Sequence, residues 1–132
     1  MARFAAVVVA LAGTAALTLS DRGPALLGAI ERRTDRLVDV SVPGDPATFG
    51  HLVVWGLIAL MAATLPRTPL GVVAVVVGLA LASLGLEFAQ TVMTTSRSAE
   101  WRDIEANLLG VTIGGAAGAA GALTRPARRF RW

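Results

Sequence analysis

Four long apolar blocks, separated by short polar stretches, constrain the fold of this chain more than any other feature. A membrane-spanning helix needs roughly 20 mostly apolar residues, and each block is close to that length once its flanking residues are included. The third block, residues 70–86, carries nothing more polar than Ser83, so it is apolar on every face. Such a helix is either buried in a large protein or faces lipid, and 132 residues are too few to bury four of them. The sequence therefore predicts an integral membrane protein.

The predicted fold is a single all-α domain with four transmembrane helices, a short helix in the membrane interface and a basic C-terminal tail. The interfacial helix is expected because Leu26, Ile30 and Leu37 fall on one helical face and charged residues lie off it. A solvated loop helix remains an alternative for that segment. The expected ranges are about 2–20, 47–65, 69–90 and 104–123 for the spans, 24–40 for the interfacial helix and 124–132 for the tail.

The first apolar block also has the features of a cleaved signal peptide. Arg3 precedes a short apolar core, and residues 10–12 form a small-residue site of the kind that signal peptidases cut. Cleavage there would leave three spans. The apolar run continues past that site to Leu19, however, and this favours a retained span.

The composition agrees with a membrane location and argues against nucleic-acid binding. The chain is 55% hydrophobic and 16% charged, whereas soluble domains are about 45–50% apolar and about 25% charged. The pI of 11.3 reflects the absence of Lys, Tyr and Cys, because the net charge is only +3. A nucleic-acid binder would need a clustered basic face as well as a high pI. The lack of cysteine also excludes disulfides and thiolate chemistry.

The charged residues outside the spans give a weak orientation. In a four-span layout six arginines lie on each side of the membrane, so the positive-inside rule returns a tie. The side that holds the termini carries no acidic residue outside the spans, and the arginine-rich tail suits the anionic cytoplasmic leaflet. We therefore expect a multi-pass protein of the inner (plasma) membrane with both termini in the cytoplasm.

Polar residues at the ends of three spans indicate where a functional site lies. Ionisable groups inside spans are costly and are functional candidates by default. The second span begins, the third ends and the fourth begins at the same membrane face, whichever orientation is correct, so their polar residues converge there. The candidates are His51, Glu87 and Asp103 for acid–base chemistry, and Gln90, Arg97, Arg102 and Asn107 for binding.

Glycines in the last span predict how that helix packs. Gly110, Gly114 and Gly118 recur every four residues. Small residues at this spacing let two helix backbones approach closely in lipid. The alternative is that the repeat reflects only the high glycine and alanine content of this segment, but the spacing favours packing.

The polar residues and these glycines also fall into two ordered motifs. The first is Glu-x-x-Gln at 87–90, a short loop with Arg97, and then Asp-x-x-x-Asn-x-x-Gly-x-x-x-Gly at 103–114. The second motif is His51 followed one helical turn later by the aromatic Trp55.

Taken together, the two motifs resemble those of the VanZ-like family of membrane proteins, over roughly residues 45–118. Two positions depart from the family pattern: Thr48 stands where members often have lysine, and Trp55 stands where they have tyrosine. The resemblance implies a small multi-span bacterial membrane protein. It also implies a link to the lipoglycopeptide antibiotic teicoplanin, since the founding member is connected with resistance to it.

Three classes of function fit these residues. One is binding of an anionic lipid or a lipid-linked envelope molecule at the outer face, with Arg97 and Arg102 holding phosphate. Another is catalysis on a lipid substrate, with His51 as general acid or base and Glu87 or Asp103 orienting it. The third is structural, either as a buried network between helices or as a subunit of an envelope complex. No cofactor or metal-ligand spacing is evident, and a homo-oligomer is left open.

Overall fold

The computed structural model describes residues 1–20, 29, 46–66, 68–93 and 100–123, and these ranges hold four long α-helices and no strand. The all-α prediction is therefore confirmed for this part of the chain, and each helix begins and ends within three residues of its expected range. The expected interfacial helix at 24–40, Arg97 and the tail at 124–132 lie outside the described residues. The helices are α1 (Ala2–Thr18), α3 (Pro46–Ala62), α4 (Pro69–Met93) and α5 (Trp101–Leu123).

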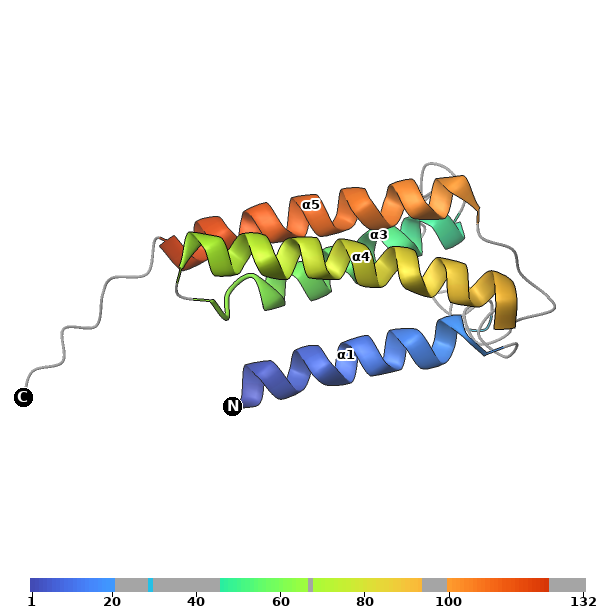
Figure 1. The fold of residues 1–132 in the computed structure, drawn as a ribbon, viewed down its shortest axis with the longest axis horizontal. Helices are drawn as coiled ribbons and strands as arrows, with labels where there is room; N and C mark the ends of the chain where they lie inside the picture. The colour runs from blue at the N-terminus through green and yellow to red at the C-terminus, as the bar shows by residue number, and fades with distance from the viewer. Residues whose placement is uncertain (21–28, 30–45, 67, 94–99, 124–132) are drawn as a thin grey trace, which may run out of the picture.

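The four helices run roughly along one common axis (Figure 1). α3 and α5 point in the same direction and make the most extensive contact of any two helices, while α4 runs the opposite way beside them. α1 packs more loosely, against α3 and α4. As a result, α3 and α5 begin, and α1 and α4 end, at the same end of the bundle, opposite the N-terminus (Figure 1).

Local sequence signals fix where α4 and α5 begin. Thr68 caps α4, because its side-chain oxygen accepts a hydrogen bond of 3.1 Å from the backbone N–H of Gly71. Pro69 is the first residue of α4, a position at which its missing N–H costs nothing. At the start of α5 the carbonyl of Glu100 accepts from the backbone N–H of Asp103 at 3.0 Å. The acidic Asp103 in that first turn also suits the positive end of the helix dipole.

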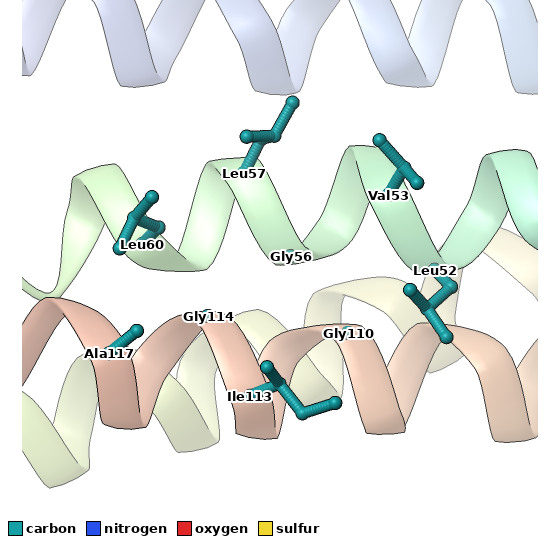
Figure 2. A pocket seen from close by; sticks show the side chains of 9 residues that line it. All are labelled: Leu52, Val53, Gly56, Leu57, Leu60, Gly110, Ile113, Gly114 and Ala117. Carbon is teal, nitrogen blue, oxygen red and sulfur yellow. The ribbon is translucent and has the colours of Figure 1, made fainter.

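Glycines set the distance between α3 and α5. We call Gly56, Gly110, Gly114 and Gly118 the glycine contact; Figure 2 shows Gly56 of α3 opposite Gly110 and Gly114 of α5. A Cβ on Gly118 would lie 2.5 Å from the carbonyl oxygen of Leu60, and one on Gly110 would lie 3.0 Å from the backbone nitrogen of Gly56. The backbones are therefore too close for any side chain at these positions, which is the close approach that the four-residue spacing indicates.

The hydrophobic core lies where α3, α4 and α5 meet, with one contribution from α1. Most of its residues are small or medium in size, and Trp55 is the single large one. Close van der Waals packing of these side chains helps to hold the helices together. The buried hydrophobic residues of this core are Val7, Trp55, Ile58, Ala59, Ala62, Leu79 and Val111.

One of the described helices is long and apolar enough to cross a membrane. α4 has 25 residues, and only 11% of its most apolar 18-residue stretch is buried within the protein. α1 and α3 are apolar but have 17 residues each, about 25 Å of helix, whereas the hydrocarbon core of a bilayer is about 30 Å thick. Large apolar side chains such as Leu81 and Phe88 point away from the protein.

Candidate functional site

Five polar side chains from three helices meet at the end of the bundle where α3 and α5 begin. We call Thr48, His51, Glu87, Asp103 and Asn107 the polar cluster. The cluster brings together three elements that are distant in the sequence, because α4 returns to this end of the bundle just as α5 begins (Figure 1). The convergence expected from the order of the helices is thus present for His51, Glu87, Asp103 and Asn107.

Asn107 joins His51 to Glu87. Its Oδ1 lies 2.9 Å from Nδ1 of His51, and its Nδ2 donates a hydrogen bond of 2.9 Å to Oε1 of Glu87. Because the amide nitrogen is used as the donor to Glu87, the amide oxygen faces His51 as an acceptor. The same carboxylate oxygen of Glu87 lies 3.4 Å from Nδ1 of His51, so the three side chains form a closed triangle.

Asp103 lies on the other side of the imidazole ring. Its Oδ2 is 3.6 Å from Nε2 of His51, and its Oδ1 accepts a hydrogen bond of 2.9 Å from the hydroxyl of Thr48. Thr48 and His51 are three residues apart on α3, which places both side chains on one face of that helix. Each nitrogen of His51 thus faces an oxygen atom of the protein, Nδ1 at 2.9 Å and Nε2 at 3.6 Å.

The polar cluster is almost closed to solvent. The side chains of Glu87 and Asp103 are 3% and 8% exposed, and the most accessible group is His51 at 14%. Two buried carboxylates therefore share one imidazole between them. Removing one member of such a buried charged set is costly, because its partner is left without compensation.

The buried face of α4 changes from apolar to polar as it approaches the cluster. Leu79 and Ser83 are followed on this face by Glu87 and Gln90, and all four are buried. Ser83 is a residue that the sequence analysis did not select, although its spacing of four from Glu87 was the available signal. Its hydroxyl donates a hydrogen bond of 2.9 Å to the carbonyl of Ala80, so its donor is paired within α4.

Of the two predicted arginines, only Arg102 lies in the described part of the chain. Arg102 is exposed on α5, and the ion pairs of Glu87 and Asp103 among the described residues are with His51. Arg97 lies outside the described residues. Within the described ranges no group of three or more His, Asp or Glu side chains is arranged to hold a metal ion.

Trp55 and Thr48 are the two positions that the sequence analysis singled out as departures from the expected motif. Trp55 is buried in the hydrophobic core one turn below His51, so at this position the chain supplies apolar volume. Thr48 holds Asp103 through a hydrogen bond that its hydroxyl donates. Sequence reasoning treated Thr48 as a departure and did not select it as a site residue, although its spacing from His51 was again the signal.

Comparison of the chain with known protein families, with characterised proteins and with solved structures found no match.

Proposed function

We propose that this protein is a four-span membrane protein of the bacterial cell envelope. The support is that apolar side chains cover the outside of the bundle, while the buried polar residues gather at one end. Little of α4 is buried within the protein, which is unlike the core helix of a soluble bundle. α1 and α3 are shorter than the hydrocarbon core of a bilayer. The difference in length would be made up by flanking residues or by local thinning of the membrane.

The proposed orientation places both termini in the cytoplasm and the polar cluster near the outer face. We expect a fusion of alkaline phosphatase after Trp132 to be inactive in a bacterial host, because the enzyme folds only outside the cytoplasm. A fusion inserted in the segment between α1 and α3 should be active and serves as the matched control. The opposite pair of results would reverse the orientation.

The function that we propose for the polar cluster is binding at the outer membrane face, in the manner that the resemblance to VanZ-like proteins suggests. The ligand would be a lipid-linked envelope molecule or a lipoglycopeptide, and the cell would show altered sensitivity to that antibiotic. The carrying observation is the closed His51–Asn107–Glu87 triangle, backed by Asp103. Catalysis with His51 as general acid or base is the alternative; its Nδ1 lies 2.9 Å from Oδ1 of Asn107, and its Nε2 lies 3.6 Å from Oδ2 of Asp103, beyond hydrogen-bond distance.

A teicoplanin susceptibility assay in a heterologous bacterial host tests this function. We expect expression of the wild-type protein to shift the inhibitory concentration at least fourfold, and His51→Ala, Glu87→Ala and Asp103→Ala to abolish the shift at matched membrane abundance. Glu105→Ala is the matched control, since that carboxylate is exposed on the same helix as Asp103. No shift with the wild-type protein would contradict the proposed function. A shift retained by all three variants would show that the polar cluster has no part in that function.

A further inference from the structure

An apolar groove runs between α3 and α5 (Figure 2). Its volume is about 290 Å³, and its walls contain only aliphatic side chains and glycine. The groove is an open depression along the line where α3 and α5 touch, because the glycines of the glycine contact carry no side chain that could cover it. The residues that line it are Leu52, Val53, Gly56, Leu57, Leu60, Gly110, Ile113, Gly114 and Ala117.

The dimensions of the groove match part of a lipid chain. The groove follows α3 from Leu52 to Leu60, a rise of about 12 Å along the helix. One leaflet of a bilayer contributes about 15 Å of hydrocarbon, half of the total thickness. The groove starts beside His51, at the membrane face of the polar cluster, and runs from there toward the middle of the bundle. A single extended hydrocarbon chain would therefore fit along it within one leaflet.

A cationic side chain stands above the groove at the same end of the bundle. Arg102 precedes Ile113 by eleven residues, close to three full turns of helix, so the two side chains leave α5 on the same face. Arg102 is exposed, and none of the ion pairs among the described residues involves it. A guanidinium at the membrane interface can hold phosphate through two parallel hydrogen bonds. Arg102 thus lies on the same side of α5 as the apolar wall, about 12 Å along the helix from Gly110, where that wall begins.

We propose that the groove and Arg102 together bind one glycerophospholipid, with its phosphate on the guanidinium and one acyl chain along the groove. This proposal rests on the membrane placement given under the proposed function, but not on any role of the polar cluster. A lipid fits these observations better than a second copy of the chain, because the groove is narrow and apolar and has a cationic side chain beyond one end. The charge of Arg102 also complements a phosphate.

Native mass spectrometry of the full chain in detergent tests the phosphate contact. We expect one phosphatidylglycerol per chain, and at least fivefold weaker retention of a diacylglycerol with the same acyl chains. Arg102→Gln should weaken phosphatidylglycerol binding by at least fivefold. Arg3→Gln is the matched control, because this arginine lies on α1 at the opposite end of the bundle. Equal phosphatidylglycerol binding by the wild-type protein and Arg102→Gln would overturn the proposal.

The acyl chain contact is tested by filling the groove. Ala117→Phe should reduce phosphatidylglycerol binding by at least fivefold, whereas Ala82→Phe, at an exposed position of α4, should leave it unchanged. A lipid-free dimer that Ala117→Phe converts to a monomer would overturn the proposal in favour of a second copy in the groove. Extraction of the wild-type protein from membranes by alkaline carbonate would instead contradict the membrane placement. This measurement therefore distinguishes failure of the proposed function from failure of the lipid-binding proposal.

Discussion

Replacing Gly114 with alanine is expected to lower the free energy of unfolding by about 3 kcal/mol, near the upper end of the usual cost of overpacking. The added Cβ would overlap the carbonyl oxygen of Gly56, and it would lie 2.8 Å from the carbonyl carbon and 3.0 Å from Cα of the same residue. All three neighbours are backbone atoms, so no side chain can rotate away to make room. The helices would have to move apart along their whole contact. Thermal unfolding followed by fluorescence-detected size exclusion measures the loss.

Gly78→Ala is the matched control for this prediction. Gly78 is also a helical glycine, but a Cβ added there meets nothing within 4 Å. Alanine is a better helix former than glycine by about 1 kcal/mol, so this variant should be as stable as the wild-type protein or slightly more stable. Equal melting temperatures for Gly114→Ala and Gly78→Ala would show that α3 and α5 do not approach each other in this way.

The sequence was sufficient to predict the helices and the end of the bundle at which polar residues gather. Long apolar blocks specify helices regardless of their neighbours, and the order of helices along the chain then determines which ends lie together. The glycine spacing at 110–118 indicated a close helix contact. The spacing could not show which helix packs against this segment. That helix is α3, and its contact residue Gly56 is an isolated glycine that belongs to no spacing pattern.

The details of the site were less predictable. His51, Glu87, Asp103 and Asn107 stood out because charged and amide groups are rare in apolar helices, but their mutual distances depend on how the helices are rotated about their axes. Thr48 was overlooked because threonine is common in helices of both membrane and soluble proteins, and only its contact with Asp103 distinguishes it. Arg102 was expected to hold phosphate at the outer face, and it lies on the exposed side of α5.

Asn107→Leu is expected to be still more damaging than a methyl group at Gly114, with a loss of about 4 kcal/mol, since breaking a buried charged network costs about 3–5 kcal/mol. Asn107 is only 1% exposed and bonds to both His51 and Glu87. Leucine has the same branched set of side-chain heavy atoms and is larger than asparagine, so the loss would come from unpaired polar groups and not from a cavity. Thr112→Leu on the same helix is the control, because its exposed hydroxyl bonds only to the carbonyl of Leu108.

A double-mutant cycle with Glu87→Leu separates coupling in the network from simple loss of packing. If Asn107 stabilises the protein by donating a hydrogen bond to Glu87, replacing Asn107 should cost little stability in a protein that already lacks the Glu87 carboxylate. The free energy of unfolding that the double variant loses should then be smaller than the sum of the two single losses by about 1–3 kcal/mol. The 3.4 Å separation of His51 and Glu87 limits this coupling, because the two side chains can close on each other when Asn107 is absent. Strictly additive losses would mean that the buried amide contributes volume alone, and that the polar cluster is not a connected unit.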